Sequence, residues 1–283
     1  MSRRAALCVP ANEPRKVAKA LGSPADEVVV DLEDAVPVDE KVGSRSTVAD
    51  LPARDHGALA VRVNAVGTPW HEEDVAACAA NPAVDSIVLP KAESAASIRA
   101  LGERLEALES AAGRTRPLRI QALIESPAGV HQAAAIGTAS ERLCALIIGY
   151  ADLSASMGRR VEASWQFAQD AVLLAARLGG VEAIDGPQLT VADDERLAGA
   201  ARSAADLGFD GKWVIHPAQI GTVQTAFTPS PEEIAEAREI VAVIEHAATE
   251  GRGALTWRGR MLDEALAVSA RRTLDRSTGK EPA

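Results

Sequence analysis

Two carboxylates follow neighbouring apolar runs of the sequence and could bind a metal ion together. Glu125 comes directly after the run Ile120–Ile124, and Asp152 belongs to the GYAD segment that follows the run Leu143–Ile148. If the two runs are adjacent strands of a parallel sheet, both carboxylates lie at the same edge, one strand spacing apart. Two carboxylates with open positions suit Mg²⁺, which keeps water or substrate oxygens in the rest of its coordination sphere. An equally good interpretation of the spacing is that Glu125 caps the following helix and that Asp152 begins one.

Polar or turn-forming residues also stand at the ends of the other apolar runs. These segments are Pro10-Ala11-Asn12, Asp31-Leu32-Glu33-Asp34, Arg62 with Asn64, Pro90-Lys91, Asp185-Gly186-Pro187 and His216-Pro217. Any one of them is an ordinary turn or cap. Because they recur in register after nearly every run, they predict a common rim on which catalytic residues gather.

The apolar runs alternate with helical segments along the whole chain. Each run is short and rich in Val, Ile or Leu, as expected for parallel strands that are buried on both faces. The runs are Ala5–Val9, Val28–Val30, Leu59–Val63, Ile87–Leu89, Ile120–Ile124, Leu143–Ile148, Val181–Ile184 and Trp213–Ile215, with helical spacing between them in stretches such as Ala92–Ala107 and Asp194–Leu207. This order predicts an α/β fold, a (β/α)8 TIM barrel. An open doubly wound sheet is disfavoured because no G-x-G-x-x-G follows any run.

The composition is that of an enzyme-sized soluble chain. The 283 residues are 47% hydrophobic and 25% charged, which provides a core large enough to fold without disulfides or a structural metal. The formal charge of −10 argues against nucleic acid or an anionic membrane as a partner. Three scattered cysteines, no signal-peptide pattern and no apolar run of membrane length favour a cytoplasmic location.

The segments named above resemble a known family. In chain order they read CVPANEPRKVAKA, VVVDLEDAVPVDEK, VRVNAVGT, IVLPKAES, ALIESPAG, GYADLSASMG, AIDGP and DGKWVIHPAQI. Together they are similar to the citrate lyase beta-subunit-like branch of the HpcH/HpaI aldolase family, which includes malyl-CoA and citramalyl-CoA lyases. The resemblance implies a Mg²⁺-dependent carbon–carbon lyase, with Mn²⁺ as an alternative metal. Such an enzyme cleaves a 3-hydroxyacyl-CoA thioester to acetyl-CoA and a 2-oxo acid, or forms it by Claisen-type condensation.

The resemblance assigns roles to the rim residues by position. Glu125 and Asp152 match the magnesium ligands. Arg62 matches an arginine that faces the substrate carboxylate and thioester oxygen, where a guanidinium binds carboxylate and stabilises developing enolate charge. Glu33 and Asp34 match carboxylates that hold metal-bound water or orient Arg62, although capping of a helix or loop is a rival interpretation for Asp34.

Further residues are expected to meet CoA or to support the rim. Arg15, Lys16 or Lys19 resemble basic residues that contact the CoA phosphates, although a solvated helix face explains each of them as well. Lys91 is expected either to pair with the carboxylates of the DLED segment or to contact substrate. His216 titrates near neutrality, but we expect it to support the loop after the last strand instead of acting as a base.

The C-terminal region predicts a helical lid. A capping box at Ser230-Pro231-Glu232-Glu233 starts an amphipathic helix, and the passage TWRGRMLD before the last helix resembles the family's lid motif. The resemblance implies that Asp263 exchanges a proton with the acetyl methyl carbon in a neighbouring subunit of a homotrimer or hexamer. Capping of the last helix is the alternative. The expected divisions are a catalytic barrel (1–228), a C-terminal helix and lid (229–275) and a disordered tail (276–283).

Two other functions share these residues. A CoA-independent class II aldolase acting on 4-hydroxy-2-oxo acids uses the same barrel and metal, but it would need a histidine base and no CoA-binding lid. A citrate lyase beta subunit would act on an acyl-carrier-protein thioester within a complex. Neither the choice of acid nor the choice among lyase, synthase and thioesterase chemistry follows from the sequence.

Overall fold

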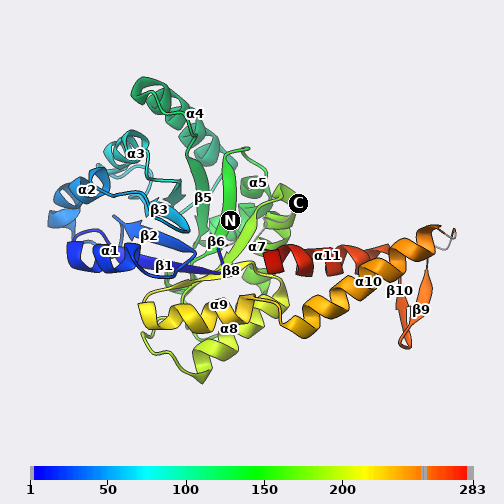
Figure 1. The fold of residues 1–283 in the computed structure, drawn as a ribbon. Coiled ribbons are helices and arrows are strands. Elements are labelled where there is room, and N and C mark those ends of the chain that lie inside the picture. Colours follow the sequence, from blue (N-terminus) through cyan, green and yellow to red (C-terminus); the bar gives the residue numbers. More distant parts are fainter. Residues whose placement is uncertain (1–2, 250, 252–253, 279–283) are drawn as a thin grey trace.

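Eight parallel strands close into a barrel that is covered on its outside by helices (Figure 1). The computed structural model describes residues 3–249, 251 and 254–278. The strands pair in chain order, and β1 pairs with β8 to close the ring. They are β1 (Ala5–Pro10), β2 (Glu27–Asp31), β3 (Ala58–Arg62), β4 (Ser86–Leu89), β5 (Arg119–Ile124), β6 (Leu143–Ile148), β7 (Glu182–Asp185) and β8 (Gly211–Val214). The predicted (β/α)8 barrel is therefore confirmed.

Helices connect the strands and form the outer layer. They are α1 (Pro14–Leu21), α2 (Lys41–Ala49), α3 (His71–Ala80), α4 (Ala95–Ala112), α5 (Pro127–Gly137), α6 (Tyr150–Met157), α7 (Gln166–Gly179), α8 (Glu195–Leu207) and α9 (Ile220–Phe227), with 3-10 turns at Val38–Glu40 and Pro217–Gln219. Side chains cap several of them: the hydroxyl oxygens of Ser94 and Ser126 accept from the backbone N–H groups of Ser97 and Gly129. Such caps satisfy amide groups that have no partner inside the helix. None of the helices in the described part of the chain is long and apolar enough to cross a membrane.

Small and branched apolar side chains fill the interior of the barrel. This inner core consists of Ala6, Val29, Ala60, Val88, Leu123, Ala145, Ile147, Ile184 and Trp213. At the amino-terminal end of the strands, a buried polar layer replaces it. There Glu27 accepts hydrogen bonds from Arg3 at 2.9 Å and from Gln121 at 2.8 Å, and Arg3 also pairs with Glu182. These contacts link strands across the amino-terminal end of the barrel, although Glu27 Oε2 and Gln121 Oε1 have no hydrogen-bond partner among the described residues. This end of the barrel serves the fold and leaves the opposite rim for chemistry.

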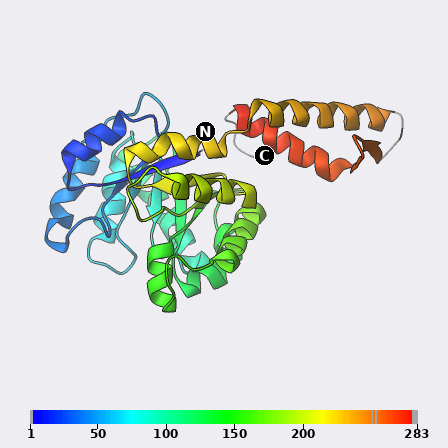
Figure 2. The same ribbon diagram turned by 90° about the horizontal axis from the view of Figure 1, so that it is seen from below.

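The last two helices and a short hairpin form an arm that projects from the barrel (Figures 1 and 2). This C-terminal arm comprises α10 (Pro231–Thr249), β9 (Leu255–Trp257), β10 (Arg260–Leu262) and α11 (Glu264–Thr278). The predicted capping box is present, because the Ser230 N–H donates to Glu233 at 2.7 Å and the Glu233 N–H donates to Ser230 at 3.1 Å.

The arm has an apolar core of its own. Side chains of α10 pack against α11 and the hairpin through Ala237, Ile240, Ile244, Leu262, Ala267 and Ala270. The hairpin turns at Arg258 and Gly259, both with positive φ, of 45° and 75°. Figure 2 shows the arm pointing away from the barrel. It therefore folds as a unit that does not depend on barrel contacts along most of its length.

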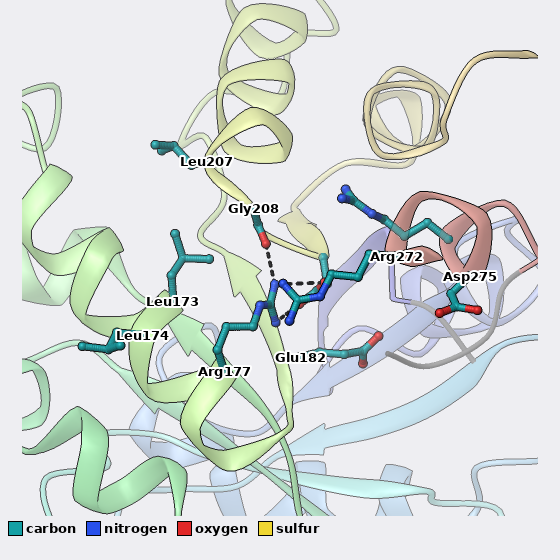
Figure 3. Close-up of a pocket in the computed structure, with 10 residues that line it drawn as sticks. Leu173, Leu174, Arg177, Glu182, Leu207, Gly208, Arg272 and Asp275 are labelled. Atoms are coloured by element: carbon teal, nitrogen blue, oxygen red, sulfur yellow. Dashed lines mark hydrogen bonds and ion pairs between the residues drawn. The ribbon is translucent and has the colours of Figure 1, made fainter. Parts of the chain in front are cut away.

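The C-terminal end of α11 returns to the amino-terminal end of the barrel. There it borders a cavity of about 310 Å³, which Figure 3 shows between Arg272 and Asp275 of α11 and Arg177 and Glu182 of the barrel. Residues Arg276–Thr278 belong to α11, so the expectation of a disordered tail is wrong for them. The remainder of the predicted tail (279–283) lies outside the described residues.

Closure of the barrel depends on a glycine. Gly211 is the first residue of β8, and a β-carbon on it would overlap the carbonyl oxygen of Arg3, which lies just before β1. We therefore expect Gly211→Ala to lower the free energy of unfolding by about 1–3 kcal/mol, measured by urea denaturation. Gly199→Ala is the matched control, since a β-carbon on Gly199 in α8 meets nothing within 4 Å, and it should leave stability unchanged or slightly higher. Equal stability of both variants would contradict this account of closure.

Candidate active site

A cavity of about 300 Å³ opens at the carboxyl ends of the strands. Its lining comes from the ends of β1, β2, β3, β5, β6, β7 and β8 and includes Asp31, Asp34, Arg62, Glu125 and Asp152. Residues that are far apart in the sequence therefore meet here, as the rim pattern predicted. We call Asp31, Glu33, Asp34, Glu125 and Asp152 the rim carboxylates.

Asp31 fixes the position of Arg62. The guanidinium donates from Nε to Asp31 Oδ1 at 2.7 Å and from Nη2 to Asp31 Oδ2 at 2.5 Å, and its Nη1 lies 3.0 Å from Glu33 Oε2. Burial alone would lower the pKa of Arg62, but the charge of Asp31 raises it well above its usual value. Arg62 is therefore a permanent, rigidly held cation whose remaining N–H donors are available beside the cavity. The sequence analysis gave Asp31 no role, and its place at the start of the DLED segment was the only signal.

Lys41 holds the loop that carries Glu33. Its ammonium donates to the carbonyl oxygens of Leu32 at 3.1 Å and Glu33 at 2.8 Å, and to Asn64 Oδ1 at 2.7 Å. Asn64 in turn donates to the buried Asp74 at 2.7 Å. A buried lysine is stable only when its donors are satisfied in this way. It is a supporting residue that sequence reasoning missed.

Glu125 is buried against the cavity directly after β5. Its Oε1 accepts the backbone N–H of Lys91 at 2.8 Å. Burial, followed by repulsion from Glu33, raises the pKa of the Glu125 carboxyl to about 8. A β-carbon on Gly149 would lie 2.7 Å from both Cβ and Oε2 of Glu125, so glycine at the start of the GYAD segment leaves room for this carboxylate.

Asp152 faces the same cavity from the first turn of α6. Its side chain is 35% exposed, and Oδ2 lies 3.5 Å from the ammonium of Lys91. The cap residue of α6 is Gly149, with no side-chain capping bond, and α5 is capped by Ser126. Glu125 therefore does not cap α5, whereas Asp152 does stand at the beginning of α6, as the alternative interpretation expected, while it also faces the cavity.

Lys91 links the rim carboxylates. Its ammonium pairs with Glu33 and lies 3.5 Å from Asp152 and 3.9 Å from Asp34. Burial would lower the pKa of Lys91, but the hydrogen bond and charge of Glu33 raise it above its usual value. The residue has φ of 50°, a left-handed conformation that costs a non-glycine residue about 1–2 kcal/mol. Of the two contacts expected for Lys91, the ion pair with the DLED carboxylates is the one present.

The donor set fits a divalent cation. Five rim carboxylates face two cations, Arg62 and Lys91. The raised pKa of Glu125 favours its neutral form, so less negative charge is buried in the metal-free site. A divalent ion would relieve this imbalance. Among the described residues, no group of three or more His, Cys, Asp or Glu side chains could hold a metal ion. Two carboxylates with open positions match Mg²⁺, whereas a structural zinc site would need four protein ligands.

Apolar and aromatic groups close the floor of the cavity. Trp213 lies under Arg62, with 5.9 Å between the guanidinium carbon and the ring centroid, and its buried indole N–H has no hydrogen-bond partner. Burial raises the pKa of the Cys8 thiol to about 12, so Cys8 stays protonated and is not a nucleophile. The low dielectric of this floor strengthens the electrostatic contacts above it.

The other predicted residues occupy different places. Arg15 and Lys19 are exposed on α1 and are not part of the cavity lining. Asp34 is half-exposed at the mouth of the cavity. His216 lies outside the cavity lining and accepts the N–H of Ala218 at 3.2 Å, so it supports the loop as expected. Asp263 accepts the N–H of Leu266 at 3.3 Å at the start of α11.

Asp263 does not reach the cavity of its own chain. It begins a helix of 15 residues whose other end borders the opposite end of the barrel. Such a helix is roughly 22 Å long, and the arm points away from the barrel (Figure 2). The lining of the cavity in the described chain comes from the barrel alone.

Glu125 should make the stability of the metal-free protein depend on pH. Its pKa is about 8 in the folded protein, against an ordinary value of 4.5. Between these values the folded chain binds more protons than the unfolded chain, so the free energy of unfolding falls as pH rises, by at most about 1.4 kcal/mol per unit.

The Glu125→Gln protein should lack this part of the slope. The measurement is urea unfolding in EDTA at several pH values between the two pKa values. Glu141→Gln, at an exposed position, is the control and should keep the slope of the parent. An unchanged slope in Glu125→Gln would show that Glu125 titrates normally.

Comparisons with known proteins agree with this geometry. Residues 4–217 match the model of the family described as HpcH/HpaI aldolase/citrate lyase. The chain is 37% identical over 285 residues to an L-malyl-CoA/beta-methylmalyl-CoA lyase of Cereibacter sphaeroides, covering 92% of this chain and 90% of the relative. It is 35% identical over 277 residues to a (3S)-malyl-CoA thioesterase of the same species, covering 96% and 93%.

A solved structure is similar over the whole chain. It is the protein CitE from Mycobacterium tuberculosis in complex with magnesium, acetoacetate and coenzyme A, with a TM-score of 0.79, 33% sequence identity and 98% of each chain covered. The family model spans the barrel strands and the rim described above, and the similarity to CitE extends over the arm. The chain belongs to the HpcH/HpaI aldolase/citrate lyase family.

Proposed function

We propose that this chain is a Mg²⁺-dependent carbon–carbon lyase of small 3-hydroxyacyl-CoA thioesters. Malyl-CoA and citramalyl-CoA are the substrates we favour, cleaved to acetyl-CoA and a 2-oxo acid or formed from them by Claisen-type condensation. The observation that carries the proposal is the convergence of Glu125, Asp152 and the rigid Arg62 on one cavity. The named lyases among the relatives and the CitE complex with magnesium and coenzyme A support it.

The rim residues divide the work of binding and charge stabilisation. Glu125 and Asp152 would hold Mg²⁺, or Mn²⁺ in its place, and the bound ion would supply a Lewis acid for the hydroxy and carboxylate oxygens of the acid. Arg62 stabilises negative charge on the thioester oxygen as the carbon–carbon bond breaks, because Asp31 and Glu33 hold it in place beforehand. Glu33 serves catalysis through Arg62 and Lys91, with which it is paired, and Asp34 orients substrate or water at the cavity mouth.

The proposed reaction needs a proton donor for the enolate carbon. In cleavage, the 3-hydroxyl loses its proton as it becomes the carbonyl of the 2-oxo acid, and the acetyl-CoA enolate gains one proton at the carbon that becomes the methyl group. Asp31 is bound to Arg62, and Glu125 and Asp152 are assigned to the metal. We assign the proton transfer to Asp263 on the arm of a neighbouring copy, which makes a homotrimer or hexamer the working unit.

Coenzyme A has a place at the side of the rim. Arg15 and Lys19 lie one turn apart on α1, which starts just after β1, and both are exposed. Neither makes an ion pair or hydrogen bond with the described part of the chain, so both are available to the CoA phosphates. Free thiols at Cys8, Cys78 and Cys144 support a cytoplasmic enzyme.

Hydrolysis of the thioester is the second candidate. The similarity to a (3S)-malyl-CoA thioesterase, 35% identical over nearly the whole chain, favours it specifically. Both reactions would use the same metal ligands and Arg62. They differ in the product, since hydrolysis releases free CoA and malate whereas cleavage releases acetyl-CoA.

The proposed activity can be tested on a panel of malyl-, citramalyl-, methylmalyl- and 3-hydroxy-3-methylglutaryl-CoA. We expect one of them to yield acetyl-CoA with Mg²⁺ and not with EDTA. Asp152→Ala and Glu125→Gln should lower kcat at least about 100-fold, a loss of roughly 2.7 kcal/mol of transition-state stabilisation, while circular dichroism stays unchanged. Glu141→Gln is the control and should keep full activity.

Other products would change the assignment. Free CoA without acetyl-CoA would favour the thioesterase. If the protein binds Mg²⁺ but turns over none of the four thioesters, a CoA-independent aldolase or a carrier-protein-dependent citrate lyase subunit would be favoured. Full activity of Asp152→Ala would refute the metal assignment.

A mixing experiment tests the role of Asp263. Asp263→Ala and Arg62→Ala should each be inactive. When the two are co-expressed, an arm with an intact Asp263 can meet a barrel with an intact Arg62, so about a quarter of the sites should work. No recovery in mixed oligomers that form normally, as judged by size-exclusion chromatography, would exclude action across subunits.

A further inference from the structure

Lys91 contacts several of the rim carboxylates at once, through its backbone N–H and through its ammonium. Its backbone N–H donates to Glu125 at 2.8 Å. At the other end of the same residue, the ammonium pairs with Glu33 and lies 3.5 Å from Asp152. One residue therefore contacts both proposed metal ligands, one through its backbone and one through its side chain.

The backbone is held in an unfavourable conformation to make these contacts. Lys91 has φ of 50° in the short connection between β4 and α4. Pro90 before it has no N–H donor, and the N–H of Ala92 after it donates to the carbonyl oxygen of Leu123 in β5 at 3.1 Å. Lysine gains nothing from this conformation by itself. Strain of this kind persists where surrounding contacts require it and is concentrated at functional sites.

The ammonium is the positive charge of the rim that can move. Arg62 is only 11% exposed and is fixed by two hydrogen bonds to Asp31. The side chain of Lys91 is 43% exposed and is a flexible stem that carries a point charge. A divalent ion held by Glu125 and Asp152 would come close to this ammonium and compete with it for Asp152.

We propose that Lys91 is the internal counter-cation of the metal site. Its ammonium holds Asp152 beside Glu33 in the metal-free protein and leaves Asp152, while keeping Glu33, when the divalent ion binds. Lys91 is thus a positioning residue that opposes metal binding, and it makes occupancy of the site depend on the metal concentration. The inference rests on the proposed assignment of Glu125 and Asp152 as metal ligands.

The test compares Lys91→Met with Lys91→Arg and with the control Arg104→Met. Methionine keeps the length and the φ preference of lysine but lacks the charge, and arginine keeps the charge. Arg104 is an exposed cation on α4 that pairs with Glu72. Arg104→Met therefore removes one positive charge, as Lys91→Met does, but at a position away from the rim. Mg²⁺ affinity is measured by isothermal titration calorimetry at constant ionic strength, and thermal midpoints are measured in EDTA and in saturating Mg²⁺.

Removal of the ammonium should destabilise the metal-free protein and strengthen Mg²⁺ binding. Lys91→Met should bind Mg²⁺ roughly threefold or more tightly than the parent, with a lower thermal midpoint in EDTA and a larger rise on adding Mg²⁺. Lys91→Arg should restore the midpoint in EDTA, and Arg104→Met should match the parent in affinity. General structural damage cannot produce this pattern, because it would weaken metal binding.

The two assignments can fail separately. Unchanged or weaker Mg²⁺ binding by Lys91→Met would overturn the counter-cation role while leaving the metal site intact. Absence of Mg²⁺ binding by the parent, or undiminished binding by Asp152→Ala, would instead overturn the metal assignment.

Discussion

The excess of negative charge at the carboxyl ends of the strands is the constraint on which this site depends. Five carboxylates converge there because the strands are parallel and their connections all emerge on one rim. Charged groups of one sign cannot be buried together without compensation. Compensation takes three forms: the Asp31–Arg62 pair, the ammonium of Lys91, and the raised pKa of Glu125. The imbalance that is left would favour the divalent cation that we propose for this cavity.

The two ends of the barrel separate stability from chemistry. At the amino-terminal end, Glu27 accepts hydrogen bonds from Arg3 and Gln121 in a buried layer, and β1 and β8 approach closely at Gly211. At the other end, the indole N–H of Trp213 has no partner and charges are unevenly matched.

The arm explains why one chain is insufficient for the proposed reaction. It has its own apolar core and points away from the barrel, so its length and direction carry Asp263 away from its own cavity. A residue presented on such an extension is accessible to another copy. The shared site that we propose follows from the same feature, since the barrel would supply binding and charge stabilisation whereas the arm would supply an acidic group on a separate support.

The sequence by itself determined the barrel, because alternating apolar runs and helical segments are local patterns, and it determined the start of α10, because a capping box needs only neighbouring residues. It located Glu125, Asp152 and Arg62 at strand ends but left capping open for the two carboxylates. Only the tertiary structure decided that question, by placing Ser126 and Gly149 at the caps. It alone revealed that Asp31 fixes Arg62 and that Lys91 joins three segments. These roles depend on distances between residues remote in the chain, and no local pattern encodes such distances.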